Sequence, residues 1–257
     1  ASLKDVREFF EAYYSPDNIT MAIVGDVDPV EVRRLVAMYF GPIKSKPRPS
    51  APDTLEPAAA GERTISLRDR HAKLPALAAS WKGMPERGTP AHHALVLLGQ
   101  ALFSGKSARL YQSLVKESRA AVSVEGALGF PVSDWDEYKA PGLFGAFVVH
   151  KREKTPLQVK ALITSEIARV AASGLSAAEL ERVKVKFRSD WVRGQQTRLG
   201  RASRLLQSAL LDGDAQAANR ELALFMAVTN DDIRRAAAAY LKSDAATWFE
   251  VTAGGGQ

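Results

Sequence analysis

The sequence predicts an α+β protein in which sheets are backed by helices. Short apolar runs of strand length alternate with longer, capped segments of helical period. A helix, a polar turn and a strand recur in the same order near both ends of the chain, which indicates repeated modules. The 257 residues, 46% of them hydrophobic, can form the core of one large domain or of two smaller ones.

The N-terminal stretch of residues 9–43 reads as helix, strand, acidic turn and second helix. The apolar run at residues 19–24 is too short for a helix and is predicted to be a strand. Asp28 is a suitable N-cap for the second helix, and Glu31, three residues later, completes a capping-box pattern. One strand and two helices cannot bury a core, so this stretch is expected to need strands from elsewhere.

The chain is expected to divide into three parts. Residues 1–45 are interpreted as the C-terminal remnant of a first αβ module. Residues 46–62 are rich in Pro, Ala and Ser and lack an apolar period, so they are predicted to be a linker. Residues 63–257 then form a second αβ module.

The second module is predicted to follow the order strand, strand, helices, strand, strand, helices, strand. Strands are expected over residues 63–69, 77–81, 122–130, 142–150 and 246–252. Helices are expected from Pro90 to about residue 103, over residues 108–118, and after the caps Thr155, Ser176 and Thr229.

The end of the chain is similar to its beginning. Residues 3–26 and residues 230–252 each hold a helix with an acidic and basic start, a tyrosine near its end, a polar turn and a strand. The tyrosines are Tyr14 and Tyr240, and the spacing from helix start to strand matches closely. The chain is therefore expected to hold the tail of one module followed by a second copy.

The distribution of charge favours a solvated surface over a nucleic-acid binding site. The net charge of +6 permits an acidic partner without requiring one. Much of the excess lies in residues 182–204, where Asp190 is the only acid, a pattern typical of a solvated helix face. Nucleic-acid binding is a weaker alternative there, because Trp191 is the only ring that could stack on a base.

Membrane spans and cysteine chemistry are not expected. No run of 18 apolar residues occurs and no secretory leader opens the chain, so neither a transmembrane helix nor a signal peptide is predicted. The absence of cysteine excludes disulfides, cysteine zinc ligands and a cysteine nucleophile in this chain. It leaves the periplasm and the cytoplasm both open.

Four segments occur in order along the chain: FFEAYYSPDNITMAIVGDVDPVEVRRLVAMYFGPI, ALVLLGQALFSGKSARLYQSLVKES, GLSAAELERVKVKF and VTNDDIRRAAAAYLKSD. Together they resemble the insulinase or pitrilysin family of zinc metallopeptidases, especially the branch of bacterial proteases and mitochondrial processing peptidases. The resemblance implies lobes of two αβ sandwich modules, each with a mostly antiparallel sheet backed by helices. Two such lobes would close into a chamber around unfolded peptides.

The resemblance also implies that the zinc site lies outside this chain. The family binds zinc through a His-x-x-Glu-His helix and a later glutamate, and this motif is absent from the sequence. The four histidines lack the required Glu and second His, and they are interpreted as cap-region or surface residues: His71, His92, His93 and His150. No metal ligand, cofactor ligand or catalytic residue is predicted, and zinc is expected only in an upstream module.

A second family feature is an Arg and a Tyr seven residues apart that polarise the substrate carbonyl. Aligned by spacing, Val115 stands where the Arg would be and Val122 where the Tyr would be. Neither can donate a hydrogen bond to an oxyanion. Arg119, one helical turn after Val115, could substitute only if the backbone took a different course.

Other hydrolase and nucleotide-binding motifs do not fit. No Gly-x-Ser-x-Gly nucleophile elbow occurs. The Gly-Lys-Ser at residues 105–107 lacks the glycine that a phosphate-binding loop needs five residues earlier, where Gln100 stands.

The function predicted from the sequence is that of a non-catalytic C-terminal region of an insulinase-type zinc metalloendopeptidase. Its expected partners are the upstream catalytic module or a homologous lobe, and an unfolded peptide substrate. A homo-oligomer through the unpaired strand at residues 19–24 is also considered. The alternative is an inactive assembly protein without a proteolytic parent, like the core subunits of mitochondrial cytochrome reductase.

Overall fold

The computed structural model describes all residues except 48, 51–52, 54–56, 58–60, 140–141 and 255–257. The chain forms two compact units. Unit 1 comprises Ala1–Leu55 with Val192–Ala218, and unit 2 comprises Glu56–Trp191 with Asn219–Gln257. About half of the predicted linker at residues 46–62 lies outside the described residues.

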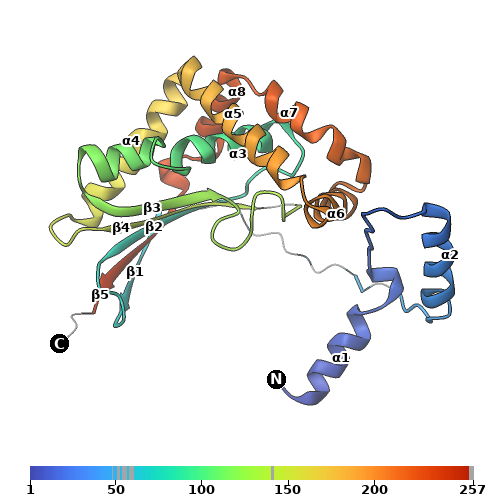
Figure 1. Ribbon diagram of the computed structural model, residues 1–257. Helices are drawn as coiled ribbons and strands as arrows, with labels where there is room; N and C mark the ends of the chain where they lie inside the picture. Colours follow the sequence, from blue (N-terminus) through green and yellow to red (C-terminus); the bar gives the residue numbers. More distant parts are fainter. Residues whose placement is uncertain (48, 51–52, 54–56, 58–60, 140–141, 255–257) are drawn as a thin grey trace. The chain divides into compact units, whose positions relative to one another are not determined.

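A five-stranded sheet is the centre of unit 2 (Figure 1). Its strands are β1 (Arg63–Asp69), β2 (Ala76–Lys82), β3 (Ala121–Leu128), β4 (Leu143–His150) and β5 (Thr247–Ala253). The spatial order is β1-β5-β2-β4-β3, and only the β1–β5 pair is parallel. All five predicted strands of the second module are present, and the mostly antiparallel α+β class is confirmed.

Helices lie on one face of this sheet (Figure 1). They are α3 (Pro90–Phe103), the π-helix η2 (Tyr111–Glu117), α4 (Pro156–Ser173), α5 (Ala177–Gly194), α7 (Glu221–Ala227), α8 (Asn230–Tyr240) and the 3₁₀ turn η5 (Ser243–Ala245). Helix α3 is buried on almost every side, because the sheet lies beneath it and α7 and α8 pack against it. Among the described residues, no helix is long and apolar enough to cross a membrane.

The helix starts follow from local capping, as predicted. The hydroxyl oxygen of Thr89 accepts a hydrogen bond from the amide of His92 at the start of α3. Thr155 and Thr229 form complete capping boxes at α4 and α8. Each box satisfies amide groups that the first helical turn would otherwise leave unbonded.

The core of unit 2 lies between the sheet and the helices. Side chains alternate along each strand, so Leu77, Trp81, Phe144 and Trp248 point toward the helices and are fully buried. The rings of Trp81 and Trp248 meet edge to face, with centroids 6.0 Å apart.

Unit 1 is mostly helical in its described residues. It contains α1 (Leu3–Tyr13), the 3₁₀ turn η1 (Pro16–Asn18), α2 (Pro29–Phe40), α6 (Arg198–Gln207) and the π-helix η3 (Ser208–Asp212), and the 3₁₀ turn η4 (Ala215–Asn219) reaches its boundary. No residue of α1 or α2 is buried, and large apolar side chains are exposed throughout this region. The first 45 residues thus have the amphipathic pattern of packed helices without the packing.

Two predictions for unit 1 are wrong. Residues 19–24 are not a strand: Ile19 has an extended backbone, but no described strand pairs with this segment. An extended segment becomes a strand only when a neighbour accepts and donates its hydrogen bonds. The capping box at α2 is incomplete, because Asp28 accepts from the amide of Val30 while the Glu31 carboxylate binds Arg34 instead.

Candidate functional site

Three of the four histidines are buried, which corrects their interpretation as cap-region or surface residues. His92 and His93 lie inside α3, and His150 lies at the end of β4 on the helix-covered side. Only His71, in the turn after β1, is exposed. The first turn of a helix is often at the surface, but α3 is buried on almost every side, and this places His92 and His93 in the core.

The buried histidines belong to the core and do not converge on a metal position. The Nε2 atom of His92 is 3.1 Å from the carbonyl oxygen of Trp135, and the His93 ring packs edge to face on Phe225 at 4.6 Å. The Nδ1 atom of His150 is 3.0 Å from the carbonyl oxygen of Lys151. Within the described ranges, no group of three or more His, Cys, Asp or Glu side chains could hold a metal ion.

The positions aligned with the family's Arg and Tyr lie on separate elements. Val115 is in η2 and packs against the core, whereas Val122 is in β3 and is half exposed. Arg119 lies between them at the junction of helix and strand, where its φ of 50° places it in the left-handed region. Its side chain is exposed.

An ion pair with both partners buried joins two distant parts of unit 2, and sequence reasoning missed it. The Arg87 Nη2 atom donates to the Glu221 Oε1 atom at 2.8 Å, with side-chain exposures of 1% and 7%. The Arg87 guanidinium also lies 5.9 Å from the centre of the Trp135 ring. Arg87 and Glu221 are 134 positions apart in the sequence, so no local sequence pattern relates them.

Trp135 belongs to an aromatic cluster that holds the loop between β3 and β4 against the helices. Its ring packs on Phe225 at 5.2 Å and on Phe187 at 5.6 Å, and stacks on Trp191 at 6.4 Å. The cluster and the Arg87–Glu221 pair together fix this loop.

A second ion pair, between Arg109 and Glu179, ties the start of the η2 region to α5. The guanidinium donates twice to the carboxylate, at 2.9 and 2.8 Å. This bidentate bond, assisted by the Ser176 amide and hydroxyl, lowers the pKa of Glu179 to about 2, although partial burial opposes the shift.

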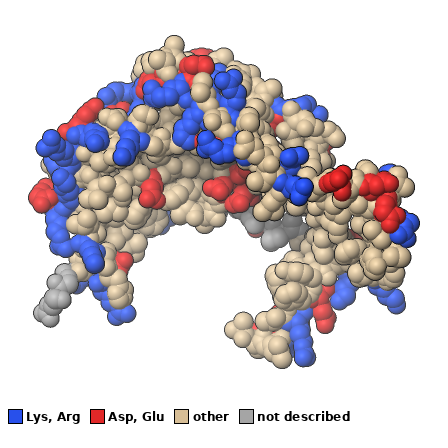
Figure 2. Space-filling view, in the orientation of Figure 1, with Lys and Arg blue, Asp and Glu red and all other residues tan. Residues whose placement is uncertain are grey.

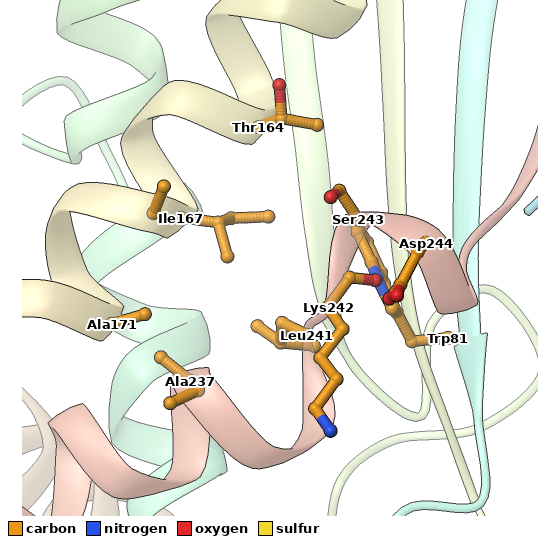
Figure 3. Close-up of a pocket in the computed structure, with 11 residues that line it drawn as sticks. Trp81, Thr164, Ile167, Ala171, Ala237, Leu241, Lys242, Ser243 and Asp244 are labelled. Atoms are coloured by element: carbon orange, nitrogen blue, oxygen red, sulfur yellow. The ribbon is translucent and has the colours of Figure 1, made fainter.

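A cavity of about 450 Å³ opens between α4, α8 and η5 on the helical side (Figure 3). Trp81 lies at its inner wall and donates its indole N–H to the carbonyl oxygen of Lys242 at 2.9 Å. Alanines such as Ala171 and Ala237 leave the space open, while Lys242 and Asp244 lie at its rim. This lining can accept an apolar group, and its titratable side chains are those of Lys242 and Asp244.

The other face of the sheet carries no helix among the described residues of unit 2 (Figure 1). By the alternation of side chains along the strands, this open face presents apolar residues that are only half-buried: Ile65, Ala78, Phe147, Val149, Phe249 and Val251. An antiparallel sheet normally exposes polar side chains on an uncovered face. The open face is therefore the part of unit 2 whose composition most suggests contact with another polypeptide.

Comparisons with known proteins agree with these observations. Residues 1–187 match a family model described as the peptidase M16 inactive domain. The zinc protease PqqE of Helicobacter pylori is 25% identical over 248 residues, which cover 96% of this chain and 54% of that protein. An uncharacterized zinc protease of Streptomyces coelicolor is 27% identical over 237 residues, covering 90% of this chain and 50% of that protein.

Solved structures show the same fold. A protease from Helicobacter pylori superposes with a TM-score of 0.86 at 22% identity, covering 98% of this chain and 59% of that chain. A peptidase M16 inactive domain from Pseudomonas fluorescens superposes with a TM-score of 0.80 at 17% identity, covering all of this chain and 58% of that one. The chain thus spans about half the length of the relatives that it matches. The family model matches residues 1–187, most of the chain, and confirms the resemblance noted in the sequence. The chain belongs to the peptidase M16 family as its inactive domain.

Proposed function

We propose that this chain is the non-catalytic half of a bacterial zinc metalloendopeptidase. In this proposal, residues 1–45 complete an upstream catalytic module, residues 46–62 connect the modules, and residues 63–257 form part of a chamber wall. Zinc is bound by the upstream module, as the names of the zinc protease relatives suggest.

The observation that carries the proposal is the correspondence between α1 and α8. Ser2 and Thr229 both begin capping boxes, both helices contain 11 residues, and a three-residue 3₁₀ turn follows each. After the second copy comes β5, a paired strand inside the sheet. After the first copy come residues 19–24, which pair with no strand among the residues that the structure describes.

Positions that are buried in the second copy are exposed in the first. Counted from the two caps, Phe10 stands where Ala237 stands, and Met21 stands where Trp248 stands. Ala237 and Trp248 are 1% and 0% exposed, whereas Phe10 and Met21 are 49% and 47% exposed. Phe10 and Met21 are large apolar residues at positions that are buried in the second copy. Their exposure supports a partner that would cover them in the way that the rest of unit 2 covers α8 and β5.

The expected partner can be described from unit 2. Helix α8 packs against α3 and α4, and β5 lies between a parallel and an antiparallel strand. By the same arrangement, α1 would pack on two helices of the upstream module. Residues 19–24 would pair as a strand between two strands of that module.

Co-expression of this chain with the segment encoded upstream of it tests the proposal. We expect a one-to-one complex by size-exclusion chromatography with light scattering, with zinc and chelator-sensitive cleavage of casein in that complex. Phe10→Lys should abolish assembly, because it places a charge at a core position. Glu8→Lys is the matched control, because its counterpart Arg235 is exposed.

Assembly of Phe10→Lys at the wild-type level would refute this use of α1. An upstream sequence without His-x-x-Glu-His would instead favour the assembly protein that lacks proteolytic activity.

In this proposal, the open face of the sheet also contacts the unfolded peptide substrate. A photo-crosslinking residue at Phe147, on the open face, should capture an unfolded casein peptide in the co-expressed complex. The same residue at Leu157, which is exposed on α4, should not. Equal capture at both positions would contradict a chamber-facing sheet.

A further inference from the structure

One end of the sheet in unit 2 gathers the ends of all five strands. β1, β4 and β5 end there, while β2 and β3 begin there. The β1–β2 turn, the segment before β3 and the β4–α4 loop therefore lie beside one another.

Backbone and side-chain hydrogen bonds tie these segments together. The Lys151 amide donates to the Ala120 carbonyl oxygen at 2.9 Å, and the His150 amide donates to the Pro75 carbonyl oxygen at 3.0 Å. The Arg152 Nη2 atom donates to the Lys73 carbonyl oxygen at 2.7 Å. Because neutral carbonyl groups accept these bonds, they hold the loops in place without neutralising any charge.

The three segments at this end, residues 68–73, 116–119 and 151–154, are strongly cationic and are named here the basic end. Its cations are Arg68, Arg70, Lys73, Lys116, Arg119, Lys151, Arg152 and Lys154. Its acids are Asp69, Glu117 and Glu153, so eight positive and three negative charges give +5 locally, against +6 for the whole chain. In Figure 2, blue side chains follow the left edge, where Figure 1 places these loops.

The cations of the basic end are not used in ion pairs. None of these eight side chains lies within 4.0 Å of a carboxylate among the described residues, and most are exposed. By contrast, the cations Arg109, Lys160 and Arg169 elsewhere in unit 2 have carboxylate partners. An open hollow of about 680 Å³ lies beside Arg68, Arg70 and His71.

We propose that the basic end binds a carboxylate-rich, extended segment of a partner protein. Four of the eight cations are arginines, whose planar guanidinium groups bind carboxylates with two hydrogen bonds. The apolar side chain of Leu67 in the lining of the hollow can contact an uncharged residue between the acidic residues of such a peptide. This proposal does not depend on an upstream catalytic module.

Other polyanions fit the same surface less well. A lipid surface presents a continuous negative charge, which would repel Asp69, Glu117 and Glu153, and Leu67 is the only large apolar side chain exposed in the hollow. A single-stranded nucleic acid gains much of its affinity from stacking on aromatic rings, and the three segments contain no Phe, Tyr or Trp.

Fluorescence anisotropy with a labelled 16-residue peptide of alternating Glu and Ser tests the proposal. The chain should bind this peptide with an affinity that falls as salt concentration rises, and should not bind the matched Lys-Ser peptide. The double variant Arg68→Glu/Lys151→Glu should weaken binding at least about tenfold. Neither side chain makes a hydrogen bond within the described residues, so the fold should persist, as circular dichroism would verify.

The matched control is Arg182→Glu/Arg188→Glu, which changes the net charge equally on the exposed side of α5. This control should bind within about twofold of wild type. Equal weakening by both double variants, or no binding by wild type at low salt, would overturn the proposal. Tighter binding to anionic vesicles or to single-stranded DNA, lost on Arg68→Glu/Lys151→Glu, would replace the acidic peptide with that partner and equally overturn it.

Discussion

The buried pair of Arg87 and Glu221 makes the sharpest stability prediction. Glu221→Gln keeps the size and one acceptor oxygen of the side chain but removes the charge that faces the guanidinium at 2.8 Å. Breaking a buried pair at one partner typically costs about 3–5 kcal/mol, because the remaining charge stays away from water. Both side chains here are almost fully buried, so we expect a loss of about 4 kcal/mol.

The measurement is urea unfolding followed by tryptophan fluorescence, since Trp135 lies against Arg87. A loss of this size corresponds to a fall in melting temperature of about 10 °C for a domain of this length. Asp231→Asn is the control: it removes an exposed carboxylate from α8 that pairs with Arg234 and Arg235, and should cost far less than Glu221→Gln because water screens these pairs.

A second variant separates charge burial from lost packing. Arg87→Met/Glu221→Leu removes both charges together and should recover much of the loss caused by Glu221→Gln. Two outcomes would contradict a costly unpaired charge at Arg87: a cost of Glu221→Gln no greater than that of Asp231→Asn, or a double variant less stable than Glu221→Gln.

Three further predictions concern other parts of the chain. The Arg109 guanidinium lowers the pKa of Glu179 to about 2, so their bond stabilises the fold fully above pH 4.5 and is lost as pH falls toward 2. Because solvent screens this partly exposed pair, Glu179→Gln should cost only about 1 kcal/mol at pH 6 and less at pH 3, as measured by urea unfolding. A difference that does not depend on pH would contradict this. Gly174→Ala should destabilise the fold by about 1–3 kcal/mol, because φ is +73° and the added Cβ would collide with the Asn230 side chain. Gly194→Ala is its control: the added Cβ meets open space, so this variant should cost nothing measurable in the same denaturation assay. The chain purified alone and soaked with zinc should hold no stoichiometric metal by elemental analysis, and casein cleavage abolished by a chelator would show that the catalytic site lies within it.

The starts of the helices could be predicted from sequence because a cap acts over three or four residues. Thr89, Thr155 and Thr229 each bind an amide three positions later, and the apolar period of the following segment needs no distant partner. The capping box at Asp28 failed for an equally local reason, since Arg34 competed successfully for Glu31. Such competition among side chains of one helix face is not visible in a motif of fixed spacing.

The candidate surfaces could be predicted only in part. The missing zinc motif and the repeated helix-and-strand pattern are both visible in the amino-acid sequence. They led to the prediction of an inactive domain, which the family model supports. The open face could not be identified, because alternating apolar residues in a strand do not reveal which face a helix will cover. The basic end was also hidden, since its charges come from three segments separated by more than 30 residues each.

The sequence by itself predicted the five strands of unit 2 and the helices that begin after Thr89, Thr155 and Thr229, and it lacks the family's zinc motif. Only the tertiary structure decided that His92, His93 and His150 are buried, and that Arg87 meets Glu221. It also showed that residues 19–24 pair with no strand in the part of the chain that the structure describes. Caps and apolar periods depend on neighbours in sequence, whereas burial, ion pairing and strand pairing depend on residues that become neighbours only when the chain folds.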